Sequence, residues 1–112
     1  MINKDNAEHY MWGASCDGWH FVKSDELSVI YERMPPNTSE SMHLHQHSKQ
    51  FFFILKGSAD FEIDGDTISL QQQNGLEVAP RIPHRIINNS GKDVEFLVIS
   101  APKSRGDRIE II

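Results

Sequence analysis

The feature that most constrains this chain is a series of short segments rich in strand-forming residues, each ended by a turn. These segments are residues 27–34, 42–47, 51–55, 59–63, 67–70, 76–78, 84–88 and 94–99. No window shows convincing helical periodicity, whereas an average domain is about one-third helix. Short strands at regular spacing favour a sandwich or a barrel. We therefore expect an all-β fold of the jelly-roll or barrel type.

Turn residues separate these segments. Pro35 and Pro36 end the first strand, because proline has no N–H to donate to a neighbouring strand. Residues 64–66, Asp-Gly-Asp, predict a tight hairpin, since Asp-Gly supplies the positive backbone angles that such a loop requires. Residues 89–92 indicate a further turn. We expect the barrel to span residues 27–100.

The two ends of the chain carry weaker patterns. Residues 1–25 predict one or two edge strands or an arm laid across the barrel. The tail, residues 101–112, is irregular until residues 109–112, which offer a last strand. A length of 112 residues corresponds to about one domain. We expect a single domain over residues 1–112.

Charge excludes one class of partner, and hydrophobic patterning excludes another. Eleven Lys and Arg stand against sixteen Asp and Glu, a net charge of −5, and no basic cluster is present to neutralise phosphates. We expect no nucleic-acid partner. The sequence does not begin like a signal peptide, and no stretch approaches the roughly 18 apolar residues of a membrane span. We expect no membrane association.

Cysteine content indicates a reducing compartment. Cys16 is the single cysteine, so no intrachain disulfide can form. Arg105-Gly106-Asp107 matches a cell-adhesion tripeptide, but short motifs have high false-positive rates outside their structural context. We therefore interpret that tripeptide as an ordinary part of the tail. These features predict a soluble cytoplasmic protein.

Several side chains suited to a divalent metal ion lie at strand-like spacings. His43, His45 and His47 alternate within one segment, and alternate side chains of a strand share a face. Gln50 comes five residues after His45, and His84 lies far downstream. Imidazole nitrogens and an oxygen on rigid strands are ligands that borderline divalent metals prefer. We place His47 at the end of its strand, near the barrel mouth, with a lesser role.

The spacing of these residues resembles the two sequence motifs of the cupin superfamily. The first motif runs His, any residue, His, three or four residues, an acidic residue, six residues, Gly. The second runs Gly, a proline-rich turn, His, three residues, Asn. The matching positions are His43, His45, Gln50 and Gly57 for the first motif, and Gly75, Pro80, His84 and Asn88 for the second. The resemblance implies a small cupin, a double-stranded β-helix barrel that holds Fe, Mn, Zn, Ni or Co.

The resemblance implies that His43, His45, Gln50 and His84 are the metal ligands. Gln50 departs from the family pattern, which has Glu here, so its amide oxygen either binds the metal or hydrogen-bonds to a bound water. Residues 79–81 replace the usual Pro-Gly step, which affects only how the strand of His84 is entered. Neutral ligands leave the ion its full charge, so we expect an anionic small-molecule ligand. A metal-free barrel with structural histidines is the alternative.

Two classes of function are compatible with such a site. The leading hypothesis is a metal-dependent enzyme acting on a small polar metabolite, since similar small cupins include dioxygenases, isomerases, epimerases, lyases and decarboxylases. The alternative is a module that binds or senses a small molecule without turnover. A general acid or base near the metal would discriminate between them, and Glu40, Asp60 and Glu62 are the nearest acidic positions. Further residues considered for the pocket wall are Trp12, Tyr31, Arg33 and Phe52.

The orientation of Gln50 determines which side chains face outward. If Gln50 points inward, Phe52 and Ile54 do as well, because side chains alternate along a strand. The large apolar side chains then left outside are Phe51, Phe53 and Leu55, with Met42 and Leu44 on the strand of the histidines. A monomer rarely exposes such a patch, so we expect a homodimer that buries it.

Overall fold

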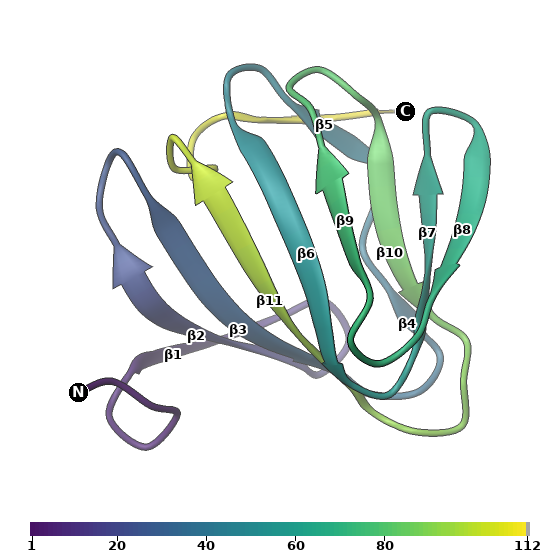
Figure 1. The fold of residues 1–112 in the computed structure, drawn as a ribbon, viewed down its shortest axis with the longest axis horizontal. Coiled ribbons are helices and arrows are strands. Elements are labelled where there is room, and N and C mark those ends of the chain that lie inside the picture. The colour runs from purple at the N-terminus through teal and green to yellow at the C-terminus, as the bar shows by residue number, and fades with distance from the viewer. Residues whose placement is uncertain (112) are drawn as a thin grey trace.

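Residues 1–111 are described by a computed structural model, in which they form strands and turns without a helix (Figure 1). The strands are β1 (Glu8–Trp12), β2 (Cys16–Lys23), β3 (Ser28–Met34), β4 (Thr38–Ser39), β5 (His43–His45), β6 (Lys49–Lys56), β7 (Ala59–Ile63), β8 (Asp66–Leu70), β9 (Gly75–Val78), β10 (His84–Asn88), β11 (Val94–Ala101) and β12 (Arg108–Glu110). Over the same residues there is no helix long and apolar enough to cross a membrane. The predicted all-β fold is confirmed.

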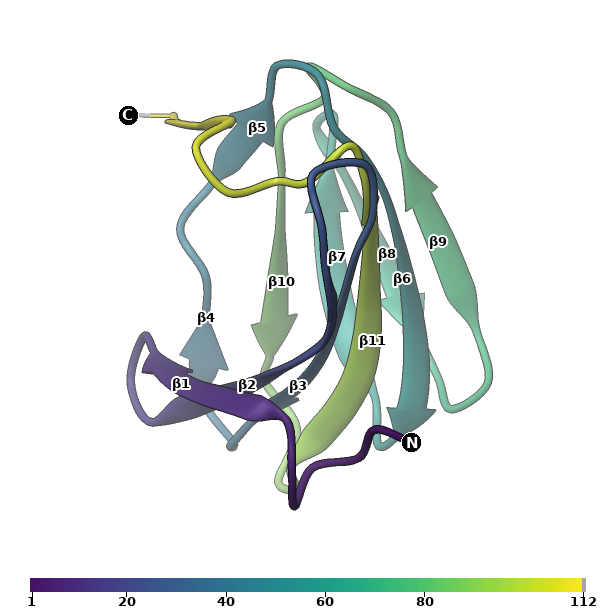
Figure 2. The same cartoon turned by 90° about the vertical axis from the view of Figure 1, so that its left-hand side faces the viewer.

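The strands form two antiparallel sheets that face each other (Figure 2). The first sheet has the order β1-β2-β3-β11-β6-β9, and the second has the order β12-β5-β10-β7-β8, with β4 also pairing with β10. Strands distant in sequence are neighbours, as β3 and β11 are, because the chain crosses repeatedly between the layers. This arrangement is the predicted jelly-roll barrel.

Alternating side chains fill the space between the two sheets. On β6, Gln50, Phe52 and Ile54 are buried, whereas Phe51 is 39% exposed on the other face. The apolar core comprises Cys16, Met34, Phe52, Ile54, Ala59, Phe61, Leu70, Val78, Ile86, Val94, Phe96 and Val98. Because successive side chains of a strand point to opposite faces, this pattern confirms the orientation expected of β6.

The strand that carries the first histidines is shorter than the expected segment 42–47. β5 ends at His45, where the chain turns and the backbone N–H groups of His47 and Ser48 donate to Asp107 Oδ2 at 2.9 and 2.8 Å. The side chain of His47 is exposed as a result. The expectation that His47 shares a face with His45 is therefore wrong, because the strand stops before reaching it.

The predicted hairpin and terminal strands are present. Asp64 and Gly65 connect β7 to β8 with φ angles of 49° and 86°, the two positive values that an Asp-Gly loop provides. The N-terminal residues form two strands, β1 and β2, at one edge of the first sheet. The predicted last strand is β12, and Ile112, with which the expected range ends, lies outside the described residues.

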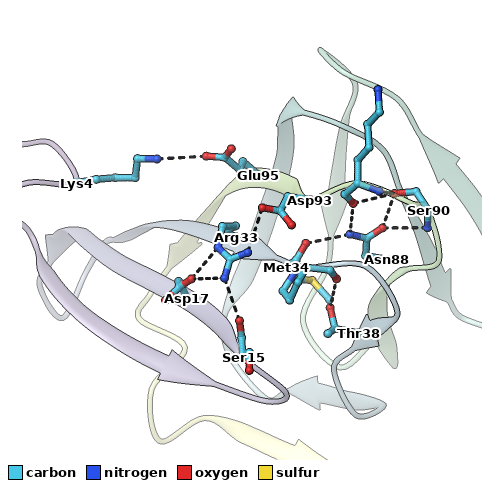
Figure 3. Close-up of polar contacts among 12 residues, drawn as sticks. Lys4, Ser15, Asp17, Arg33, Met34, Thr38, Asn88, Ser90, Asp93 and Glu95 are labelled. Carbon is cyan, nitrogen blue, oxygen red and sulfur yellow. Dashed lines mark hydrogen bonds and ion pairs between the residues drawn. The ribbon is translucent and has the colours of Figure 1, made fainter.

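Asn88 fastens the end of the barrel opposite the histidines (Figure 3). Its Nδ2 donates to the carbonyl oxygens of Met34 and Lys92 at 2.9 and 2.8 Å, and its Oδ1 accepts from the N–H and the hydroxyl of Ser90. The side chain is fully buried. The Asn of the second motif thus serves the fold, by joining β3, β10 and the turn before β11.

The C-terminal segment runs across one end of the barrel, from β11 in the first sheet to β5 in the second (Figures 1 and 2). We call residues 102–107 the strap. At its start, Ser48 Oγ donates to the Pro102 carbonyl at 2.8 Å. At its end, Asp107 accepts the two N–H groups described above, and β12 then pairs with β5. The strap is held at both ends.

Candidate metal centre

Three histidines from two neighbouring strands of the second sheet converge inside the barrel. His43 and His45 lie on β5 and His84 begins β10, directly opposite His43 in the antiparallel register. One ring nitrogen from each lies within 4.8 Å of the others. Their exposed fractions are 2%, 5% and 1%. The sequence prediction that these side chains come together is confirmed in geometry.

Backbone carbonyls fix which nitrogen of two of these rings carries hydrogen. His43 Nδ1 lies 2.8 Å from the Ser41 carbonyl oxygen, and His84 Nδ1 lies 2.9 Å from that of Ile82. A carbonyl can only accept, so each Nδ1 must donate. In a neutral imidazole the Nε2 atom then carries a lone pair. Carbonyl contacts of this kind orient histidines that bind metal ions.

Gln50 reaches this site from the first sheet. Its Nε2 donates to Ser100 Oγ at 3.0 Å, which turns Oε1 toward His84 Nε2 at 3.2 Å. Since Nδ1 of His84 holds the hydrogen, its Nε2 lone pair points to the same place as the Gln50 amide. Donor atoms about 3 Å apart suit a shared ion at ligand distances of about 2.0–2.2 Å. The observed contact therefore fits a divalent ion.

Burial keeps the three rings neutral. It lowers the pKa of His43 to about 3 and that of His45 to about 4, with a further contribution from the neighbouring His84. Burial likewise lowers the pKa of His84. Metal ligation requires the neutral imidazole, so the rings are in the binding form at neutral pH. Nδ1 of His45 is buried without a hydrogen-bond partner among residues 1–111.

A cavity of about 390 Å³ opens beside the histidines. His43, His45 and Gln50 line one part of it, and apolar side chains, including Phe52, line another. Its charged side chains are Glu32, Glu40, Arg105 and Arg108. A hollow that combines apolar side chains with convergent polar groups is typical of a site for a small molecule.

Two carboxyl groups in this cavity have raised pKa values. Burial and the nearby Glu40 raise the pKa of Glu32 to about 8, and the Tyr10 hydroxyl donates to Glu32 Oε1 at 3.3 Å. Burial raises the pKa of Glu40 to about 7, against the opposing charge of Arg108 at 4.0 Å. Carboxyls poised near neutral pH are suited to donate and accept protons. Sequence reasoning considered Glu40 but missed Glu32, which alternation with the inward Ile30 would have indicated.

The other acidic positions considered lie outside the cavity. Asp60 accepts from Ser69 Oγ at 2.6 Å, and Glu62 pairs with Arg85 at 2.9 Å on the outer face. Of the pocket-wall candidates, Phe52 lines the cavity.

The remaining three wall candidates do not line the cavity. Tyr31 donates to Glu95 at 2.6 Å, and Arg33 pairs with Asp17 and Asp93 (Figure 3). Trp12 packs against the apolar core. Their side chains therefore serve the fold, because each is engaged by neighbours away from the histidines.

Comparison with known proteins gives one family and a range of relatives. Residues 30–100 match the Cupin_2 family, described as a cupin domain. A relative, the uncharacterised protein MJ1618 of Methanocaldococcus jannaschii, is 23% identical over 83% of this chain and 74% of its own length. This chain covers 45% of the length of a second curated relative.

Two solved structures share the fold at low sequence identity. A predicted oxalate decarboxylase from Thermotoga maritima is 18% identical, with a TM-score of 0.82 over 92% of this chain and 99% of the other. The polyketide cyclase RemF from Streptomyces resistomycificus is 14% identical, with a TM-score of 0.84 over 100% of this chain and 84% of the other. At such identities the likeness concerns the fold alone.

Proposed function

This chain belongs to the cupin family, and on that premise we propose that its three inward histidines and Gln50 hold a divalent metal ion at which a small anionic metabolite binds and reacts. The ion is one of those expected from the sequence, Fe, Mn, Zn, Ni or Co. The observation that carries the proposal is the convergence of one ring nitrogen from each of His43, His45 and His84, which lie within 4.8 Å of one another inside the barrel. The Gln50 amide lies beside them, 3.2 Å from His84 Nε2.

The neutrality of the four donors indicates the charge of the metabolite. Three imidazoles and an amide leave a divalent ion its full charge in a partly dry cavity, where uncompensated charge is costly. A carboxylate or an enediolate would offset it. Such an ion would act as the Lewis acid of the reaction.

The carboxyl groups of the cavity support an enzyme over a binding module. Glu32 and Glu40 share the cavity with His43 and His45, and their raised pKa values allow either group to hold or release a proton at neutral pH. Apolar side chains, Phe52 among them, line part of the same space. The structural relatives carry different activity names, and a fold hosts many chemistries, so the reaction class follows from the site and not from the fold. A protein that binds or senses the metabolite without turnover is the second candidate.

We also propose a homodimer, with a correction to the surface expected from the sequence. Leu44 belongs to β5 of the second sheet, and Met42 directly precedes that strand. Phe51, Phe53 and Leu55 belong to β6 of the first sheet. The five side chains therefore do not form one patch. The outer face of the first sheet carries Phe51, which is 39% exposed, and several half-buried apolar side chains. Register places the following outward side chains in adjacent rows: Trp19, Tyr31, Val29, Leu97, Ile99, Phe51 and Phe53.

Metal analysis tests the central proposal. Purified chain should carry about one divalent ion per chain, His84→Ala should lose it, and the exposed His47→Ala should retain it, because His47 lies outside the cluster. Gln50→Glu should hold the metal more tightly and bind oxalate more weakly, since a carboxylate cancels part of the charge. Equal metal content in wild type and His84→Ala would contradict the metal site. Unchanged metal and oxalate affinities in Gln50→Glu would remove Gln50 from it.

A further inference from the structure

Arg105 is a cavity-lining guanidinium that lacks a partner in residues 1–111. It makes no hydrogen bond or ion pair there, and its Nη1 atom is buried. By contrast Arg33, Arg85 and Arg108 each pair with a carboxylate. A guanidinium carries five N–H donors and stays charged, so leaving it unpaired in a partly buried place is costly. This cost suggests that its partner comes from outside the chain.

The strap holds Arg105 over the cavity. Asp107, two residues later, accepts the N–H groups of His47 and Ser48, and Lys103, two residues earlier, donates its N–H to the Asp25 carbonyl at 3.0 Å. Gly106 has a φ of 79°, a left-handed conformation that suits glycine. The tripeptide Arg105-Gly106-Asp107 thus places one side chain into the site and uses another as an anchor.

The neighbouring groups favour an anion beside Arg105. His20 lines the same cavity and has a buried Nδ1 without a partner among the described residues. The two acidic side chains of the cavity do not compensate Arg105, since Glu32 accepts from Tyr10 and Glu40 faces Arg108. With a pKa of about 8, Glu32 is mostly protonated at neutral pH and does not repel an incoming anion.

We propose that Arg105 is an anion subsite, which binds a carboxylate or phosphate group at one end of the metabolite while the metal centre holds an oxygen donor at the other. This inference rests on the proposed function and narrows its substrate class to small molecules with two anionic or oxygen-donor ends. Guanidinium binds both kinds of anion through paired N–H···O bonds. The cavity of about 390 Å³ accommodates a metabolite of this size.

Calorimetric titration tests the subsite. The zinc-loaded chain is titrated with dicarboxylates from oxalate to glutarate, with phosphonoacetate, and with acetate as a single-ended reference. In wild type the best double-ended probe should bind at least about tenfold more tightly than acetate, as expected for added charge-assisted hydrogen bonds. The probe that binds best identifies a carboxylate or a phosphate end.

Variants assign the effect to the guanidinium. Arg105→Gln should reduce the affinity of the best probe to that of acetate, and Arg105→Lys should restore it only in part, because a lysine lacks the planar fork. Arg81→Gln is the matched control: it removes one charge from an exposed arginine outside the cavity lining and should leave the preference intact. Thermal melts establish that the variants fold.

The outcomes separate this inference from the metal proposal, since zinc content is measured first and every titration is repeated on metal-free chain. Zinc bound with no preference for double-ended probes, or an equal preference in Arg105→Gln, overturns the subsite alone. Failure to bind zinc, with Arg105-dependent anion binding retained, contradicts the metal centre alone. Loss of both contradicts both.

Discussion

Two kinds of titratable residue line the cavity, and burial moves their pKa values in opposite directions. His43 and His45 fall from 6.5 to about 3 and about 4, whereas Glu32 and Glu40 rise from 4.5 to about 8 and about 7. Both shifts favour the neutral form, as expected where charge is poorly solvated. At neutral pH the histidines and Glu32 are therefore mainly neutral, whereas the two arginines of the cavity keep their charge.

These shifts predict how the stability of the metal-free chain depends on pH. The histidine pKa values are depressed in the folded state, so their contribution to stability is present above pH 6.5 and is lost as pH falls toward about 4 and about 3. The glutamate pKa values are raised, so the contribution of Glu32 is present below pH 4.5 and is lost as pH rises through about 8. Opposing slopes between these limits should give a broad optimum near mildly acidic pH.

Glu32→Gln isolates the glutamate contribution. A neutral amide does not lose a proton, so the Tm of the variant minus that of wild type should grow as pH rises from about 5 to about 8, in differential scanning calorimetry of metal-free chain. Glu95→Gln is the control, because Glu95 also accepts a tyrosine hydroxyl but has a lowered pKa, so its difference should stay flat over that range. A flat difference for Glu32→Gln would show that this carboxyl is already ionised.

At the scale of strands, much of the fold and part of the site could be predicted from sequence. Alternation and turn residues located the strands of the barrel, since both signals are local. The histidines followed from the spacing of two motifs. Arg105 could not be found in this way, because the strap reaches the cavity only through contacts with Asp25 and the loop at His47, far away in sequence. The length of β5 was overestimated for the same reason, because the strand ends where the following residues bind Asp107, which is distant in sequence.

A substitution at Asn88 measures how much one side chain at the end of the barrel opposite the histidines contributes to stability. Asn88→Ala removes both donors to the carbonyl oxygens of Met34 and Lys92, which are left without that partner in a buried place. We expect a loss of about 2–3 kcal/mol in the free energy of unfolding, measured with urea. Asn89→Ala, at an exposed neighbour that bonds only Asp60, should cost about 0.5 kcal/mol or less. Equal losses would mean that the network is dispensable.

At the scale of the whole molecule, the apolar outer face of the first sheet predicts self-association. Phe51→Lys places a charge within that face and should convert a dimer to monomer in sedimentation velocity at micromolar concentration. Ile68→Lys is a close control, since Ile68 is 38% exposed against 39% for Phe51 but lies on β8 in the second sheet. Wild type that sediments as a monomer would rule the dimer out.

The donors of the proposed metal centre are divided between the two layers of the barrel. Three histidines stand on the second sheet and Gln50 stands on the first, at the junction with Ser100 of β11. Separation of the layers therefore breaks the coordination sphere, and an ion bound by all four donors has affinity only for the folded chain. By mass action each tenfold rise in free metal above its dissociation constant then adds about 1.4 kcal/mol to folding. The melting temperature of the chain would then rise with the concentration of free metal.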